Sequence, residues 1–207
     1  MLTARSCPEN LGLKIVTYPH PTLRHVSKPI RRLDAELRQH IQEMFDLMYA
    51  AKGIGLAANQ VDLPLRFFIC NLAGERGQGE ELVFLNPVLS RHKGQSIREE
   101  GCLSMPGLYA PVRRPETVHL EAYGLDGSAI SLDLDEMMAR VVQHEVDHLD
   151  GVLFTDRLSD TVEMDVKPML YEFELDYESR QHTGEIPDNG VIAARLAELE
   201  EQYAILS

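Results

Sequence analysis

The chain has 207 residues, 44% of them hydrophobic and 26% charged, a balance typical of a globular protein with one sizeable core. Its formal net charge of −13 argues against a general affinity for nucleic acid or an anionic membrane surface, because either would need clustered Lys and Arg. No apolar run approaches transmembrane length, and residues 1–12 lack the apolar region of a secretory signal. Three scattered cysteines are poor material for a disulfide framework, so we expect a cytoplasmic protein.

The first regular element that the pattern predicts is a helix over residues 34–52. An acidic cap precedes it, a glycine follows it, and one apolar stripe runs along it, formed by Leu37, Ile41, Met44, Phe45 and Met48. Before this helix we expect a loose lead-in over residues 1–11. The proline-containing loop that comes next carries His20 and His25, which we expect at the surface or at helix caps.

Residues 53–60, Gly-Ile-Gly-Leu-Ala-Ala-Asn-Gln, precede an expected strand over residues 65–70. Two glycines and two alanines leave the main chain open to a substrate, although tight packing would explain them as well. The stretch lacks the Gly-Lys-Ser/Thr ending of a phosphate loop. Gln60 is more specific, because a side-chain amide can donate a hydrogen bond to a developing oxyanion.

Further strands are expected over residues 82–85, 117–123 and 128–134. A polar loop over 73–81 precedes the first of them, and Asn86-Pro87 should close it. The other two alternate apolar and polar residues around an Asp-Gly turn, which predicts a hairpin. On the polar face of this hairpin we expect His119 to be exposed to solvent; His92 and His182, in polar loops, get the same interpretation.

A helical metal site is predicted at residues 143–151, Gln-His-Glu-Val-Asp-His-Leu-Asp-Gly. His144 and His148 are four residues apart, so on a helix both imidazoles lie on one face and can share a metal ion. Glu145 lies beside that ion, where its carboxylate can take a proton from water without binding the metal. The alternative is an amphipathic helix that happens to carry two surface histidines.

The third ligand is expected at Cys102, in the stretch Glu-Glu-Gly-Cys-Leu-Ser-Met-Pro-Gly over residues 99–107. A thiolate there would complete a Cys-His-His set and leave one coordination position open for chemistry. The alternative for Cys102 is a small buried hydrophobe, which is what most free cysteines are. That interpretation suits Cys70, in an apolar strand, much better, and Cys7 lacks a rigid support.

Together, residues 53–60, 100–106 and 143–151 resemble the three signature motifs of the peptide deformylases, in the same order and with similar spacing. The resemblance covers about residues 13–157 and implies a hydrolase that removes the formyl group from the N-terminal formylmethionine of nascent peptides. It implies Fe(2+) as the metal, while a Cys-His-His set would also accept Zn(2+), Ni(2+) or Co(2+). Transient work at the ribosome is implied too, with no direct nucleic-acid binding and no membrane.

The resemblance also implies residue roles. The metal ligands are Cys102, His144 and His148, and Glu145 moves the proton. The oxyanion donors are Gln60 and the backbone N–H of Leu103. The residues expected to bind the substrate are Ile54, Gly55, Gly101, Arg140 and Val141, with the stem of the arginine at the rim of the methionine pocket.

Two other functions stay open. A zinc endopeptidase also uses His-Glu-x-x-His, although no third His or Glu follows at a typical distance. A metal-stabilised binding module is the second, although a structural zinc site usually closes with a fourth Cys or His and none stands near.

The expected architecture is α+β: antiparallel strands packed around a central metal-binding helix, with additional N-terminal and C-terminal helices. We expect a catalytic domain over residues 1–157 and an acidic helical extension over 158–207, which holds 12 Asp and Glu against 3 Lys and Arg. Two apolar stripes in this extension should pack on the domain or on another subunit; they comprise Val162, Val166, Met169, Leu170 and Phe173, and Ile192, Leu196, Leu199 and Tyr203.

Overall fold

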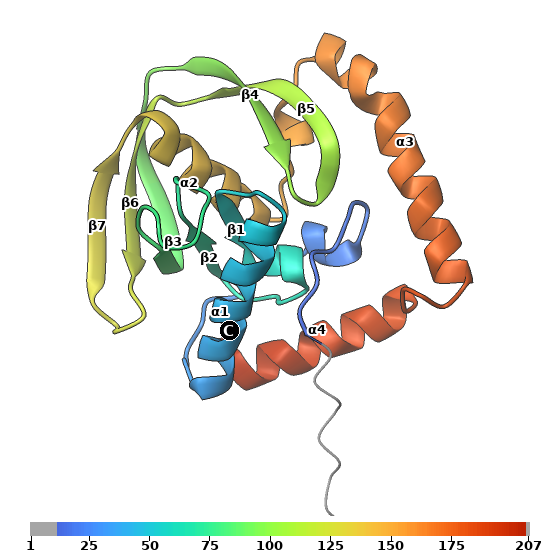
Figure 1. Ribbon diagram of the computed structural model, residues 1–207, viewed down its shortest axis with the longest axis horizontal. Coiled ribbons are helices and arrows are strands. Elements are labelled where there is room, and N and C mark those ends of the chain that lie inside the picture. Colours follow the sequence, from blue (N-terminus) through green and yellow to red (C-terminus); the bar gives the residue numbers. More distant parts are fainter. Residues whose placement is uncertain (1–11, 206–207) are drawn as a thin grey trace, which may run out of the picture.

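The structure, a computed structural model, describes residues 12–205, and the predicted lead-in with Cys7 lies outside them (Figure 1). The helices are α1 (Ala35–Ala50), α2 (Glu136–Leu149), α3 (Asp160–His182) and α4 (Asn189–Tyr203), with short 3-10 turns η1 (Pro21–Arg24), η2 (Ala58–Val61) and η3 (Phe154–Arg157). The strands are β1 (Gly55–Ala57), β2 (Phe67–Cys70), β3 (Leu82–Lys93), β4 (Ser96–Cys102), β5 (Met105–Arg114), β6 (Thr117–Tyr123) and β7 (Ala129–Leu134). The fold is α+β. Within residues 12–205, no helix is long and apolar enough to span a bilayer.

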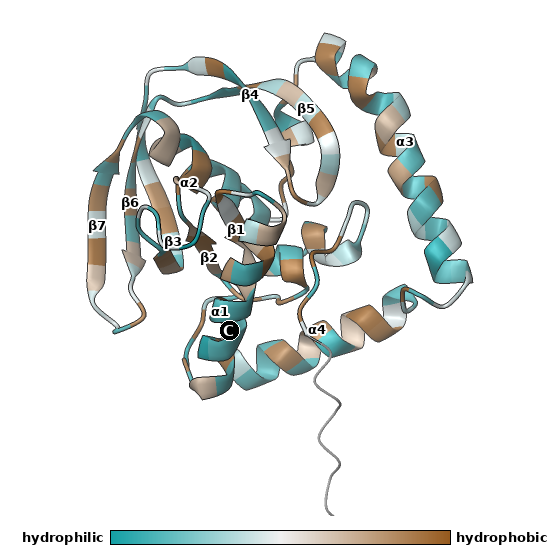
Figure 2. Ribbon diagram, in the orientation of Figure 1, coloured by the Kyte–Doolittle hydropathy of each residue, from teal (hydrophilic) through white to brown (hydrophobic). Residues whose placement is uncertain are grey.

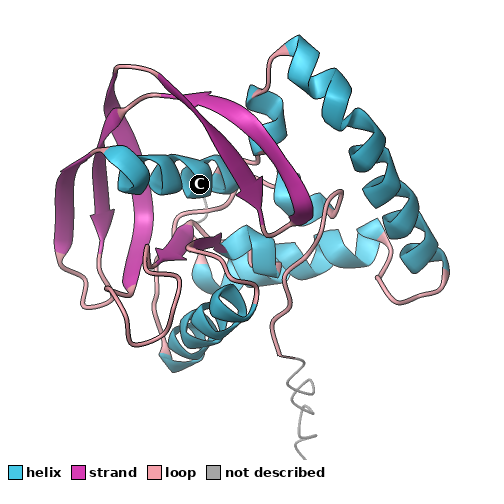
Figure 3. Cartoon of the chain, turned by 45° about the horizontal axis from the view of Figure 1, so that its top comes forward, coloured by secondary structure: helices cyan, strands magenta, loops and turns pink. Residues whose placement is uncertain are grey.

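The strands form two antiparallel sheets. Five of them pair in the order β1-β2-β3-β6-β7, while β4 and β5 make a separate two-stranded ribbon. Figure 3 shows this ribbon curving above α2. The β6–β7 hairpin has the predicted Asp-Gly turn, with Tyr123 paired to Ala129 at its end. Connections between sheet and ribbon are short, and side chains of α2 bond the ribbon at Ser96 and Glu100.

Helix α2 packs its apolar side against the five-stranded sheet. Val142, Val146 and Leu149 recur at helical spacing and belong to a buried cluster with Phe68 and Leu120 of the sheet. Burying this side fixes which way the helix faces. Its other side, which carries the histidines, is thereby turned toward the ribbon.

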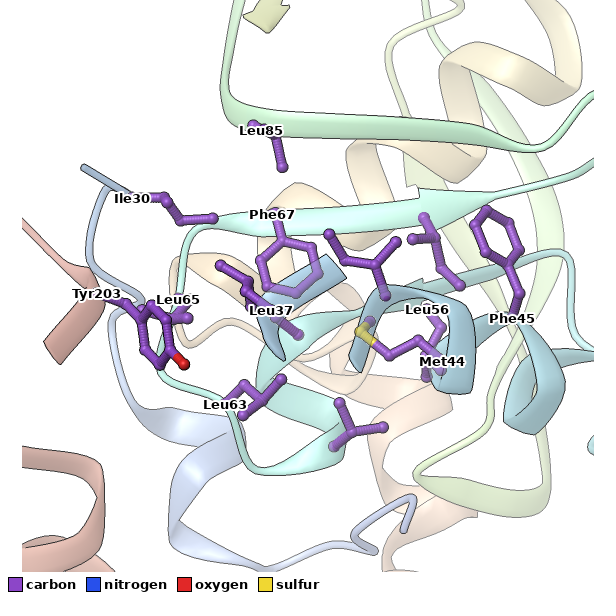
Figure 4. Close-up of a cluster of buried hydrophobic side chains, with 14 of the residues drawn as sticks. Ile30, Leu37, Met44, Phe45, Leu56, Leu63, Leu65, Phe67, Leu85 and Tyr203 are labelled. Carbon is purple, nitrogen blue, oxygen red and sulfur yellow. The ribbon is translucent and has the colours of Figure 1, made fainter. Parts of the chain in front are cut away.

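Helix α1 lies against the outer side of β1 and β2. All five residues of its predicted stripe are buried, in a second cluster that also contains Leu56, Phe67 and Ile69. Figure 4 shows Tyr203, from the C-terminal end of the chain, beside Leu37 and Leu65 in this cluster. Residues from both ends of the described chain therefore share one core.

The C-terminal extension forms the two predicted helices, and both pack on the domain. Figure 1 shows α3 running past β5 and α4 returning beneath the molecule to α1. Val166 of α3 joins a third buried cluster beside β5, and the Tyr18 hydroxyl donates to Glu174 Oε1 at 2.7 Å. Ala204 forms a bridge with Ile30. Figure 2 shows brown apolar positions alternating with teal polar ones along both helices.

Strand β3 is longer than predicted. It runs on past Asn86-Pro87 to Lys93, and its register with β6 shifts between Leu85 and Val88. A bulge takes up the proline, which has no N–H for the ladder, and Asn86 adopts a positive φ of 52° there. The Asn86 side chain then bonds both backbone groups of Ile30. The prediction that Asn86-Pro87 closes the strand was therefore wrong.

The exposure predicted for His119 was also wrong. Its side chain is buried, with Nδ1 2.6 Å from Asp133 Oδ1 and Nε2 3.3 Å from Ser131 Oγ on the neighbouring strand. These cross-strand partners cover the ring. By contrast His20 is a helix cap, as expected, accepting a hydrogen bond from Thr22 N.

Candidate metal centre and substrate cavity

Three donor atoms, from α2 and from the end of β4, converge at one point. The Cys102 Sγ and one ring nitrogen each of His144 and His148 all lie within 4.8 Å of one another. Cys102 Sγ is 3.2 Å from His148 Nε2. The four-residue spacing on α2 sets the two imidazoles one turn apart, and the register shift at Gly101 and Cys102 turns the thiol toward them.

The electrostatics of this cluster suit a cation. Burial lowers the pKa of His144, but hydrogen bonding to Cys102 and Glu100 outweighs it and raises the pKa to about 10. A positive charge is thus stabilised where the three donors meet. Burial, together with the charge of His144, holds the pKa of His148 well below its ordinary value, so this imidazole is neutral and free to donate its lone pair. A thiol and two imidazoles fit a divalent ion of the zinc or iron type.

Gln60 is held beside the sulfur by the backbone N–H of Ala57. Its Oε1 accepts from Ala57 N at 2.9 Å, so its Nε2 faces the site, 3.4 Å from Cys102 Sγ and 3.2 Å from Ser104 Oγ. The Ser104 N–H also points at the sulfur, at 3.4 Å. Turn η2 therefore places an amide donor at the metal centre.

Glu145 lies on the cavity side of α2, against β1. Burial raises the pKa of Glu145 to about 7, although the charges of His144 and Arg114 oppose the shift. Its Oε2 is buried and has no hydrogen-bond partner among the described residues. A carboxyl group that is desolvated, has one unpaired oxygen and has a pKa near 7 is suited to accept and release a proton.

A cavity of about 650 Å³ opens beside this cluster. Ten of the eleven residues proposed from sequence line it, and they are Ile54, Gly55, Gln60, Gly101, Cys102, Leu103, Arg140, Val141, His144 and Glu145. The eleventh, His148, lies behind Cys102. Sequence reasoning gave no role to Tyr109 or Met137, which also line the cavity, because neither belongs to a motif.

Glu100 is the functional residue that sequence reasoning missed. Its buried carboxylate faces His144, whose Nδ1 donates to Oε2 at 3.0 Å, and it accepts from Arg114 through Nε at 2.7 Å and Nη2 at 2.9 Å. Burial raises the pKa of Glu100, but hydrogen bonds from His144 and Arg114 outweigh it and hold the pKa well below its usual range. A carboxylate on the far nitrogen of a ligating histidine fixes the orientation of its ring. Glu100 and Cys102 are two residues apart, but this spacing identifies Glu100 only once the stretch is known to be a strand.

The same charge network continues along α2. Arg114 Nη1 donates to Asp147 Oδ2 at 2.6 Å, and Arg157 pairs with the same carboxylate from the turn η3. On the other side of the helix, Asn59 Nδ2 donates to the carbonyl of His148. Helix α2 is thus tied to the ribbon through the Asp147 side chain and to η2 through its backbone at His148.

Comparisons with known proteins agree on one family. The model of a family described as polypeptide deformylase matches residues 12–164. A peptide deformylase of Rhodopirellula baltica is 54% identical over 193 residues, covering 93% of this chain and 96% of the relative. A peptide deformylase of Chromobacterium violaceum is 44% identical over 158 residues, covering 76% of this chain and 93% of the relative.

Comparison of the backbone fold with solved structures indicates the same family. A crystal structure of a plant peptide deformylase superposes with a TM-score of 0.81 at 39% sequence identity. The superposition covers 89% of this chain and 99% of the plant chain.

Proposed function

The chain belongs to the polypeptide deformylase family and removes the N-formyl group from newly synthesised polypeptides; from this premise we propose how its own residues perform the reaction. The observation that carries the proposal is the meeting of three separate sequence motifs at one cavity of about 650 Å³. One motif brings Gln60, one brings Cys102, and one brings Glu145 between two histidines.

Cys102, His144 and His148 would hold one divalent ion. Such an ion supplies Lewis acidity, which favours ionisation of water near neutral pH and stabilises negative charge on a carbonyl oxygen. The chain's part is to fix the donor set. Glu100 holds the ring of His144, and Gln60 and the Ser104 N–H stabilise negative charge on the sulfur.

Glu145 carries the proton. Its carboxylate accepts a proton from the attacking water at Oε1 or Oε2, and then delivers it to the nitrogen that leaves as the amine of methionine. The nitrogen needs that proton because an amide anion is a very poor leaving group. A pKa raised by burial to about 7 suits both steps at neutral pH.

Negative charge that develops on the formyl oxygen needs donors in place beforehand. Gln60 Nε2 lies 3.4 Å from Cys102 Sγ, and the backbone N–H of Leu103 follows Cys102 directly. We assign both as oxyanion donors. Loss of one such donor typically costs about 3–4 kcal/mol of transition-state stabilisation.

The formylmethionyl peptide binds in the cavity. Gly55 and Gly101 offer main-chain atoms and little bulk, and Ile54 and Val141, with the stem of Arg140, line the space for the methionine side chain. The cytoplasm is the proposed location, and nascent peptides met transiently at the ribosome are the proposed substrates. A direct contact with nucleic acid is not part of the proposal, in keeping with the net charge of −13.

The catalytic domain is proposed to comprise residues 1–157, built around α2, with 158–207 as an acidic extension. The Chromobacterium violaceum relative supports this division, because it matches over only 158 residues, which are 93% of its own length.

Glu145→Gln tests the proton carrier. In an anaerobic assay of formate release from formyl-Met-Ala-Ser, this variant should lose about 10²- to 10⁴-fold in kcat while keeping one metal ion per chain, because the carboxylate moves a proton but does not ligate. The exposed Glu121→Gln on β6 is the matched control and should stay within about twofold of the wild type. Metal bound at full occupancy with wild-type kcat in Glu145→Gln would remove Glu145 from the mechanism.

Iron(II) is the proposed metal, on family resemblance, and it carries a separate prediction. A thiolate beside iron(II) is prone to oxidation, so iron-loaded enzyme should lose activity in air, whereas nickel-loaded enzyme should not. The measurement is residual formate release after timed exposure to oxygen, with and without reductant. Equal lifetimes of the two forms would argue against iron as the metal that the site is suited to.

A further inference from the structure

Arg140 lines the cavity, and its guanidinium is bonded to the β4–β5 ribbon. The residue is only 5% exposed. Its Nη1 donates to Glu100 Oε1 at 2.5 Å and to the Val112 carbonyl at 3.1 Å, and its Nη2 donates to the Ser96 carbonyl at 3.1 Å and to Ser96 Oγ at 2.9 Å. Four contacts with β4 and β5 leave this head group little capacity for a substrate.

The partner that matters among these is Glu100. Its two oxygens divide four donors: Oε1 accepts from Arg114 and Arg140, while Oε2 accepts from Arg114 and His144. Glu100 is 8% exposed, so losing one donor would leave a buried carboxylate short of a hydrogen bond. Its orientation therefore depends on both arginines.

Arg140 and His144 are four residues apart on α2, so they project from the same side of the helix one turn apart. Both bond the one carboxylate of Glu100. The contacts form a closed loop, because the backbone of α2 links Arg140 to His144 and both side chains bond Glu100. This loop joins α2 to β4 two residues before Cys102.

We propose that Arg140 is a positioning residue of the metal centre, which holds Glu100 in the orientation that aims His144 at Cys102 and His148. The inference rests on the proposed metal-binding role of His144. It differs from substrate binding by the same residue, because it places the effect in metal affinity and not in the affinity for formyl peptide.

Arginine and lysine at position 140 should differ in how well they hold Glu100. A guanidinium donates in a fixed fork and can reach Glu100, Val112 and Ser96 together, whereas an ammonium restores the charge but not the fork. Losing a partner that orients a ligating group typically lowers metal affinity by about 10- to 100-fold. Lysine should therefore recover part of the loss and methionine none.

The experiment measures Co²⁺ affinity of the full chain by competition with a chelator for Arg140→Met, Arg140→Lys and Arg157→Met. The last is a matched control, since Arg157 also pairs with α2, through Asp147, but does not touch Glu100. The ligand-field spectrum of the bound cobalt reports on the ligand geometry. Melting of the metal-free proteins separates loss of fold from loss of site, and kcat and KM are measured with metal in excess.

We expect Arg140→Met to bind Co²⁺ about 10- to 100-fold more weakly with an altered cobalt spectrum, Arg140→Lys to fall between it and the wild type, and Arg157→Met to stay within about twofold. With metal in excess, kcat should fall while KM stays within about twofold. Should Arg140→Met not fold, the lysine variant carries the test.

Unchanged Co²⁺ affinity and spectrum with a raised KM would overturn the proposal and return Arg140 to the substrate. Equal weakening by Arg157→Met would overturn it too, since any break in the network would then suffice. Wild-type protein that binds Co²⁺ but releases no formate would refute the deformylase mechanism instead, and the affinity series would still decide the role of Arg140.

Discussion

Gly55 lies so close to Glu145 that no methyl group fits between them. An added Cβ would lie 2.4 Å from Glu145 Oε1 and 3.0 Å from Val141 Cγ1. Gly55→Ala should therefore displace the catalytic carboxylate and lower kcat/KM for formate release by about 100-fold, the cost of a misplacement near 1 Å. Gly12→Ala is the control, because its Cβ would meet nothing within 4 Å. Indistinguishable kcat/KM values for the two variants would mean that Glu145 has room to move.

The sequence motifs made the three metal ligands predictable. The side chains that support these ligands could not be predicted in the same way. Two histidines four residues apart lie on one face of a helix, and the same spacing places the glutamate beside them. The choice between Glu99 and Glu100 as the partner of His144 depends on which side of β4 faces α2, and that follows from pairing with β5. Because Arg114 comes from β5 as well, only the folded ribbon brings the network together.

The last turn of α4 packs into the core through Tyr203 and fastens this helix to the domain. Tyr203 is 2% exposed and its hydroxyl donates to Glu36 Oε2 at 2.9 Å. Tyr203→Ala should lower the free energy of unfolding by about 3–5 kcal/mol, as for other buried aromatic residues. Tyr203→Phe keeps the ring and should lose only about 1–2 kcal/mol with the hydrogen bond. Denaturant unfolding measures both, and a wild-type midpoint for the alanine variant would show that α4 does not stabilise the domain.

Elements with a strong period were predicted well, and those set by pairing were not. The stripes of α1, α2 and α4 are visible in the sequence, because a buried helix face repeats regularly. In the stripe predicted for α3 only Val166 is buried, and Met169 is 40% exposed. No local pattern predicted β4, because the Ser96–Cys102 stretch has three charged residues among its seven and pairs with β5 as a ribbon exposed on one side. The packing site of α4 could not be predicted for the same reason, because it depends on Ile30 and Leu37, which are distant in sequence.

The stability of the whole molecule should respond to pH through His20, where α3, α4 and the N-terminal segment meet. Tyr177 packs edge-on against the ring, Asp62 Oδ2 lies 3.9 Å from Nε2, and Arg195 pairs with Asp62. Burial, with the charge of Arg195 adding to it, lowers the pKa of His20 to about 4.

Because the histidine pKa in the unfolded chain is about 6.5, the unfolded state binds a proton between pH 6.5 and 4 that the folded state refuses. Stability is therefore retained above pH 6.5 and lost as the pH falls. His20→Asn keeps an N-cap acceptor but cannot titrate. From pH 7.5 to 5 the wild type should lose about 2 kcal/mol more unfolding free energy than this variant. Parallel pH profiles of the two proteins would contradict this account.

The bridge between Ile30 and Ala204 has a consequence for how the protein is made. Synthesis delivers residues 30–85, with most of one core cluster, long before Tyr203 and Ala204, which complete it. Until then Ile30 and Leu37 lack the partner that covers them, and an apolar surface is open to other chains. An enzyme that trims the beginnings of nascent proteins thus completes this core only after Tyr203 and Ala204 have been synthesised.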